Sequence, residues 1–372
     1  MRSVLSGFLV LCQVALLSGA VEASEWWESV KVKGDFRYRY EYIGTENKPA
    51  RNRHRIRARL GFQGEVSPYT TVVIQLSSGS DDPVSNNQTL GDGFSTKPLG
   101  LDVACFRITH PKAPGFTLEG GKFHNPFFKP ASSELLWDSD WNPEGGTLHY
   151  TRDFPHGNVT LTGAGFWVDE RSTDKDSYMA AAQGALRLDL NDKKTALTLG
   201  AGYFNYVHAK GYRPFWDPED SFGNTTRQAV LDGDTVAVYA TDFDLVELSA
   251  LASSKIGEIP VTVAGDFVTN TAADSLGTGW LVALGIGKAA KVGGWELRYV
   301  YREVDRDAVV GIYTDSDFRG GGTDGKGHEF GGVLQIARNT TFNVTYFSNS
   351  IGTQSDNSLG FKRVQIDLQT KF

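Results

Sequence analysis

The sequence predicts an all-β fold, a transmembrane antiparallel β-barrel of about 16 strands with short periplasmic turns and long extracellular loops. Three observations predict it. Segments that alternate apolar and polar residues recur from end to end, several are longer than the strands of soluble sheets, and the connections between them alternate between short and long. Glycine supplies 42 of the 372 residues and methionine only 2, a composition that argues against a helical bundle.

The amino terminus has the pattern of a secretory signal. Arg2 supplies a positive charge, the residues from Val4 to Leu17 are mostly apolar, and Val21-Glu22-Ala23 is a suitable cleavage site. We therefore expect residues 1–23 to be a signal peptide and residues 24–372 to be the outer-membrane barrel domain. Cleavage would leave Cys105 as the one cysteine, so an internal disulfide is not expected.

The first two segments after the signal show a period of two. Apolar or aromatic residues occupy alternate positions from residue 30 to residue 42, and the pattern returns between residues 53 and 66 after a short polar stretch. Successive side chains of a strand point to opposite faces, so this pattern predicts a hairpin. Strands of about 13 residues exceed the roughly 5 or 6 usual in soluble sheets and are long enough to cross a bilayer at a tilt. This length disfavours the alternative of a soluble sheet with its charged face in water.

Similar segments recur along the rest of the chain. We expect further strands near residues 69–79, 100–110, 115–123, 145–152, 158–169, 178–190, 194–207, 240–253, 259–270, 278–290, 294–304, 327–338, 341–349 and 359–372. A barrel of about this size encloses an aqueous channel. A count of about 18 is the nearest alternative, because residues 211–238 are long enough to contain one more hairpin.

The chain ends on an alternating segment whose last residue is aromatic. Its apolar face consists of Val364, Ile366, Leu368 and Phe372, interrupted by Thr370. This pattern resembles the C-terminal recognition strand of outer-membrane proteins. We therefore expect these four residues to direct membrane assembly through the periplasmic and outer-membrane assembly machinery.

Several short motifs carry a family resemblance. They are the arginine-rich opening hairpin, Gly120-Gly121-Lys122 with Asn125-Pro126-Phe127, Trp137-Asp138-Ser139-Asp140 with Glu144-Gly145, and the segment from Tyr239 to Asp244 with Ile259-Pro260-Val261. Together they resemble the "putative porin" family of Gram-negative outer membranes. The resemblance implies a porin domain over residues 24–372. It also implies passive diffusion of small hydrophilic solutes or ions through the cell outer membrane.

Arginines share one face of the opening hairpin. A charge on the lipid face would cost about 2–4 kcal/mol at mid-membrane, so these side chains are expected to face a water-filled lumen. We predict a pore-lining basic wall formed by Arg37, Arg39, Arg53, Arg55, Arg57, Arg59 and Arg107.

The segment between Lys122 and Glu144 supplies carboxylates that could neutralise this wall. We predict that it folds inward as a constriction loop whose acidic residues are Glu134, Asp138, Asp140 and Glu144. A basic wall opposite an acidic loop would create a transverse field and set the ion preference. The arginines could instead brace the wall by pairing with these carboxylates, and the two roles can coexist.

Aromatic residues have two expected roles. Pro126, Phe127, Phe128 and Trp137 are expected to pin the constriction loop to the wall, with a stacking surface for sugar rings as the alternative. Aromatic side chains elsewhere are expected to form girdles at the membrane interfaces, and the main examples are Trp167, Tyr203, Tyr206, Trp280 and Trp295.

Catalytic and metal-binding motifs are weak in this sequence. Asp138-x-Asp140-x-Asn142 begins like a calcium loop, but Pro143 stands where an EF-hand needs glycine. The acidic pairs Asp305 with Asp307 and Asp315 with Asp317 lie in a glycine-rich loop and are expected to be solvated. No G-x-S-x-G motif occurs, and the 7 histidines lack metal-ligand spacing. We expect no metal site, no cofactor and no enzymatic activity.

Other functions remain open at this point. The alternatives are an outer-membrane barrel enzyme such as a hydrolase, a substrate-specific sugar or anion channel, and a secreted carbohydrate-binding β-protein. A net charge of -7 disfavours nucleic acid as a partner. The expected partners are outer-membrane lipid, small hydrophilic solutes or ions, and the assembly machinery. Analogy with general porins allows a homotrimer.

Overall fold

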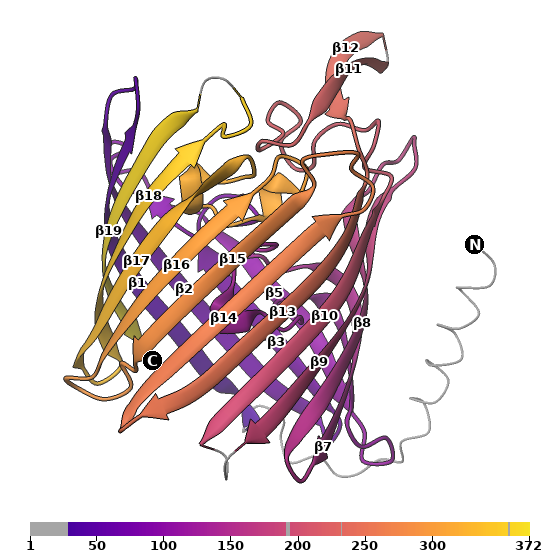
Figure 1. Cartoon of the computed structure of the whole chain (residues 1–372). Coiled ribbons are helices and arrows are strands. Elements are labelled where there is room, and N and C mark those ends of the chain that lie inside the picture. Colours follow the sequence, from indigo (N-terminus) through magenta and orange to yellow (C-terminus); the bar gives the residue numbers. More distant parts are fainter. Residues whose placement is uncertain (1–28, 191–193, 232, 356–357) are drawn as a thin grey trace.

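The computed structural model describes residues 29–190, 194–231, 233–355 and 358–372. Its long strands form one closed, tilted barrel in which each barrel strand pairs antiparallel with the next barrel strand along the chain (Figure 1). The expected signal peptide, residues 1–23, lies outside the described residues. None of the described helices is both long and apolar enough to cross a membrane.

The barrel contains 16 strands, which confirms the predicted count. They are β1 (Lys31–Thr45), β2 (Arg51–Ser67), β3 (Thr70–Ser78), β5 (Leu99–Thr109), β6 (Phe116–Lys122), β7 (Glu144–Phe154), β8 (Gly157–Asp169), β9 (Ser177–Leu190), β10 (Thr195–Val207), β13 (Phe243–Ile256), β14 (Ile259–Asn270), β15 (Thr278–Gly287), β16 (Trp295–Val304), β17 (Gly325–Ala337), β18 (Thr340–Ile351) and β19 (Leu359–Lys371). The two-residue β4 (Gln88–Thr89) adds a short pairing to β2.

The alternative count of 18 strands is wrong, although the region behind it does contain a hairpin. β11 (Thr226–Leu231) and β12 (Asp234–Tyr239) pair with each other in a separate two-stranded sheet. This hairpin projects beyond the loop end of the barrel (Figure 1). Because neither strand bonds to a barrel strand, the hairpin adds nothing to the wall.

The barrel closes where β19 meets β1. Tyr38 pairs with Leu368 and Tyr42 with Val364 in this register. The backbones of Gly34 and Phe372 complete the seam through two reciprocal N–H···O bonds of 3.0 Å. A Cβ atom at Gly34 would lie 2.4 Å from the Phe372 ring, so this close approach requires glycine.

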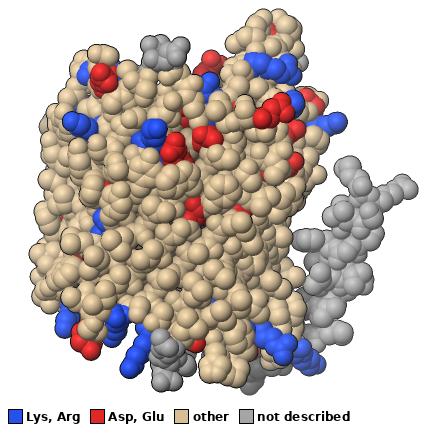
Figure 2. All heavy atoms as spheres, viewed as in Figure 1, with Lys and Arg blue, Asp and Glu red and all other residues tan. Residues whose placement is uncertain are grey.

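The alternation in the sequence separates an outer apolar face from a polar interior. On β1, Phe36, Tyr38 and Tyr42 are exposed on the outside, whereas Asp35, Arg39 and Glu41 are buried inside. Figure 2 shows Lys and Arg gathered along the rim of turns, with a mostly uncharged surface above them. This is the surface that a barrel presents to lipid.

Most of the aromatic residues expected in the girdles lie on the outer face. Trp167, Tyr203, Trp280 and Trp295 are exposed there. The prediction was wrong for Tyr206, which is only 2% exposed and points into the barrel. It lies one position from the outward Asn205 on β10, so the one-residue alternation of the strand turns it inward.

Candidate pore and its constriction

Two long connections fold into the barrel and approach each other. The constriction loop, residues 123–143, joins β6 to β7, and a second inward loop, residues 305–324, joins β16 to β17. The Asp138 N–H donates to the Tyr313 carbonyl over 2.8 Å, and the Ser316 N–H donates to the Asp138 carboxylate over 2.9 Å. These bonds hold the two loops together inside the lumen.

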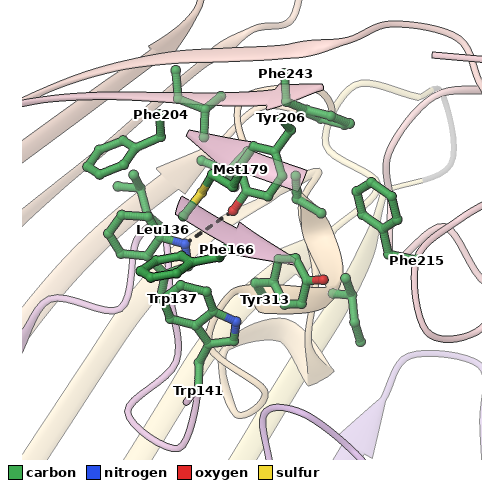
Figure 3. Packing of buried hydrophobic residues seen from close by; sticks show 14 of the residues in the cluster. Leu136, Trp137, Trp141, Phe166, Met179, Phe204, Tyr206, Phe215, Phe243 and Tyr313 are labelled. Carbon is green, nitrogen blue, oxygen red and sulfur yellow. Dashed lines mark hydrogen bonds between the residues drawn. The ribbon is translucent and has the colours of Figure 1, made fainter. Parts of the chain in front are cut away.

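Aromatic packing pins the constriction loop to the wall, as predicted. Trp137 is only 1% exposed, and its ring stacks on Trp141 with the centroids 5.2 Å apart. Its indole Nε1–H donates to the Tyr206 hydroxyl over 3.3 Å (Figure 3). Phe204 on β10 meets the Trp137 ring edge-on, and Tyr313 brings the second inward loop into the same cluster. Burial on this scale stabilises the folded loops mainly through the hydrophobic effect.

The wall of β19, β1 and β2 is polar, and arginine side chains dominate it. The Arg39 guanidinium donates to both oxygens of Asp367 on β19, over 2.7 and 2.8 Å. It also pairs with Asp317 of the second inward loop over 3.1 Å. Arg39 therefore joins two strands of the wall to a loop in the lumen.

Other arginines of this wall have carboxylate partners too. Arg57 and Arg59 both bind Asp35 and both approach Asp140 of the constriction loop at 3.5 Å. Arg53 binds Glu41, and Arg363 lies between Glu41 and Asp317. The paired set contains five arginines and five carboxylates, namely Arg39, Arg53, Arg57, Arg59 and Arg363 with Asp35, Glu41, Asp140, Asp317 and Asp367. As a unit it carries no net charge.

Arg37 and Arg55 differ from the other arginines of the wall. Neither has a carboxylate within 4.0 Å among the residues that the structure describes. The Arg37 guanidinium donates to the Asn87 side-chain oxygen over 2.5 Å, and that of Arg55 donates to the Asn87 carbonyl over 3.2 Å. The Nε atoms of both arginines are buried and have no hydrogen-bond partner among the described residues. These two side chains therefore carry the buried surplus of positive charge on the wall, to which the exposed Arg51 at the start of β2 adds at the mouth.

A family model described as "putative porin" matches residues 43–228 and 219–372 of the chain. The matched residues cover most of the strands and both inward loops. The chain belongs to the "putative porin" family. It is an outer-membrane porin channel.

Solved structures support the same fold. OprB of Pseudomonas putida is 10% identical, with a TM-score of 0.61, and the match covers 93% of this chain and 94% of that one. The outer membrane channel DcaP of Acinetobacter baumannii is 12% identical, with a TM-score of 0.51 and coverage of 92% and 97%. The trimer form of OmpT of Vibrio cholerae is 12% identical, with a TM-score of 0.52 and coverage of 92% and 100%. No curated protein matches the sequence.

The acidic residues predicted for the constriction of this porin separate into different environments. Only Asp140 approaches the basic wall. Glu134 accepts a bond from the Ser139 N–H and Asp138 from the Ser316 N–H, so both organise loop backbone. Glu144 is the first residue of β7 and pairs with Lys122 on β6. The prediction that all four face the arginines was therefore wrong, because packing of the loop turns Glu134 and Asp138 away and Glu144 lies exposed on β7.

The second inward loop was missed as part of the constriction. Asp315 and Asp317 were expected to be solvated, but Asp315 is 3% exposed and binds Arg302, and Asp317 binds Arg39 and Arg363. The expectation of solvation was also wrong for Asp307, which is buried and accepts the Thr225 N–H. The apolar residues 308–310 beside these acids are the signal that could have indicated an inward loop.

Arg107 lies apart from the rest of the predicted basic wall. Its guanidinium binds Glu119 on β6 over 2.7 Å, and Glu119 also lies 3.5 Å from His149 on β7.

In the C-terminal strand, Leu368 is exposed on the outer face, while Val364 and Ile366 share that face and Phe372 closes the seam. Cys105 is buried and free. Among the described residues no group of three or more His, Cys, Asp or Glu side chains could hold a metal.

A vestibule of about 430 Å³ opens on the extracellular side of the constriction. Its lining includes Arg53 and Arg55 of β2, Arg363 of β19, and Asp82 of the loop between β3 and β5. Burial raises the pKa of the Asp82 carboxyl above 3.8, although the Val84 N–H and Arg55 act to lower it. Asp82 can therefore lose its charge at a higher pH than an ordinary aspartate.

Proposed function

We propose that small hydrophilic solutes diffuse passively through this porin, past the two inward loops and on the side of the basic wall of β19, β1 and β2. The aromatic cluster packs these loops against the opposite wall. Water and solutes would then pass on the side of the charged wall. No energy-coupling element is required, since the solute gradient drives the flux.

The observation that carries the proposal is the imbalance of charge along this wall. The five paired arginines are neutralised by carboxylates of β1, β19 and the two loops, whereas Arg37 and Arg55 are not. A surplus of fixed positive charge beside a narrow aqueous path attracts anions and repels cations. The porin would therefore prefer anions.

Planar-bilayer recording of the refolded protein in a potassium chloride gradient tests this function. Stable conductance steps with a reversal potential of the sign expected for a chloride-selective channel would support this function. An inserted, folded barrel with no conductance would contradict the channel, and a reversal potential of the sign set by potassium would contradict the anion preference.

We further propose how the porin reaches and occupies the membrane. Residues 1–23 would direct export, and Val364, Ile366, Leu368 and Phe372 would present the C-terminal strand to the assembly machinery. The trimer form of a similar fold supports a homotrimer. Cross-linking in outer-membrane fractions tests the oligomer, and the amino-terminal sequence of the mature protein tests cleavage.

A further inference from the structure

The vestibule has a basic side and an apolar side. Its basic lining consists of Lys48, Arg51, Arg53, Arg55 and Arg363, and among the described residues Asp82 is the one carboxylate that lines it. Apolar groups, among them Phe222, Ile312 and Phe361, line other parts of the same cavity. At about 430 Å³ it lies within the range of small-molecule sites, which are concave and combine apolar surface with a few charged groups.

Arg55 is the best placed of these cations to bind a solute. Its Nη2 donates only to neutral acceptors, the Asn87 carbonyl and the more distant Ser85 hydroxyl at 3.4 Å. Arg53 and Arg363, in contrast, already share the Glu41 carboxylate. A buried guanidinium without an anionic partner is costly, so a solute carboxylate or phosphate at Arg55 would relieve that cost.

Arg37 on the neighbouring strand β1 adds a second positive charge close to Arg55. In the β1–β2 register Arg39 lies opposite Arg55 and Arg37 lies opposite Arg57, which places Arg37 diagonally from Arg55. Both side chains also meet at Asn87. Two cations without carboxylate partners thus converge on one short segment of the loop between β3 and β5.

We propose that the vestibule is a binding site for small organic anions that carry a carboxylate or phosphate head on an apolar body. The planar, multidentate guanidinium of Arg55 would bind the oxygens of the head. Phe222, Ile312 and Phe361 would contact the body. The proposal rests on the proposed diffusion route, of which the vestibule is the outer mouth.

Isothermal titration calorimetry on the detergent-solubilised, full-length barrel tests the site with four probes. Benzoate and phenyl phosphate share a ring and differ in their acidic head, benzyl alcohol keeps the ring without a charge, and inorganic phosphate lacks the ring. Saturable binding of benzoate, phenyl phosphate or both, with weaker binding of the other two probes, is expected. Binding of one acidic probe alone would identify the head group. Equal binding of benzoate and benzyl alcohol, or no saturable binding, would overturn the proposal.

Single substitutions locate the site. Arg55→Gln is expected to weaken benzoate binding about tenfold, the loss typical of one charge-assisted hydrogen bond. Arg37 lies outside the vestibule lining but beside Arg55, so Arg37→Gln should weaken binding less than Arg55→Gln and more than a distant substitution. Arg59→Gln removes the same unit of charge from a paired arginine outside the vestibule lining and should weaken binding less than about threefold. Equal losses in all three variants would show that benzoate responds to the overall electrostatic field of the lumen, and would overturn the proposed site.

The binding measurement does not depend on conduction. Normal conductance in potassium chloride without saturable benzoate binding would refute the site and leave the channel intact. Binding without conductance would refute the channel and keep the vestibule site.

Discussion

The two sides of the lumen are built from opposite chemistry and perform different tasks. On β8, β9 and β10, inward side chains such as Phe166, Met179 and Phe204 are apolar and bury the aromatic residues of the constriction loop. On β19, β1 and β2, the inward side chains are charged and meet the loops through Asp140 and Asp317. The difference indicates that the apolar side fixes the loops in place while the charged side sets which solutes pass.

The largest effect is expected from breaking the apolar side. Trp137→Ala removes the central ring of the cluster and its bond to Tyr206, and should destabilise the barrel by about 4 kcal/mol, as other buried tryptophan truncations do. The loosened loop should also increase single-channel conductance. Urea unfolding in micelles and bilayer recording measure the two effects.

Trp167→Ala is the matched control, because this ring is 67% exposed on the outer face of β8. It should leave both conductance and loop packing unchanged. A Trp137→Ala protein with the conductance of the parent would contradict the view that aromatic packing holds the constriction.

A smaller loss is expected from breaking the charged side. Arg39→Gln leaves Asp367 and Asp317 without their shared partner, and we expect about 3 kcal/mol of destabilisation. The second inward loop would lose one of its ties to the wall, so open-channel current noise should rise. Urea unfolding and the current noise spectrum measure these changes.

Arg187→Gln serves as its control. Arg187 pairs with Asp189 on the same strand and is about half exposed, so its loss should change stability by less than about 1 kcal/mol. Equal destabilisation by the two substitutions would show that the Arg39 pairs are no stronger than an exposed one.

The smallest effect is expected from acidification, which should change the ion selectivity of the vestibule. As the pH falls through the raised pKa of Asp82, its carboxylate is neutralised and the vestibule gains net positive charge. Anion preference should therefore increase as the pH falls, and the increase should begin at a higher pH than an ordinary aspartate would give. Reversal potentials recorded as the pH is lowered measure the increase.

Asp82→Asn should show the stronger preference at every pH and lose the acid-dependent change. A variant that keeps the full pH dependence would assign it to another group.

Much of the fold could be predicted from the sequence, because the alternation of apolar and polar residues that forms each strand is a local pattern. Alternation on β1 and β2 identifies lipid and lumen faces without knowledge of any partner strand, and the same reasoning placed the Arg ladder inside. The hairpin of β11 and β12 shows the limit of this approach, since alternation does not tell which sheet a strand joins.

The constriction was harder to predict because its contacts join residues distant in sequence. Arg39 meets Asp317 and Arg363 meets Glu41 across separations that no local pattern encodes. The pairing of the five arginines, and therefore the identity of the two without carboxylates, depends on how two loops fold together. Tyr206 is a different case, because local alternation alone puts it on the face opposite to Tyr203, three positions before it on β10.

The central claim is that the charges left over after pairing, on Arg37 and Arg55, set the selectivity. The most direct test compares reversal potentials of two double variants in a potassium chloride gradient. Arg37→Gln with Arg55→Gln removes the two buried cations that lack carboxylate partners, whereas Arg39→Gln with Asp367→Asn removes a paired cation and its carboxylate without changing the net charge. We expect the first variant to lose the chloride preference and the second to retain it. Retention by the first, or equal loss in both, would contradict the account.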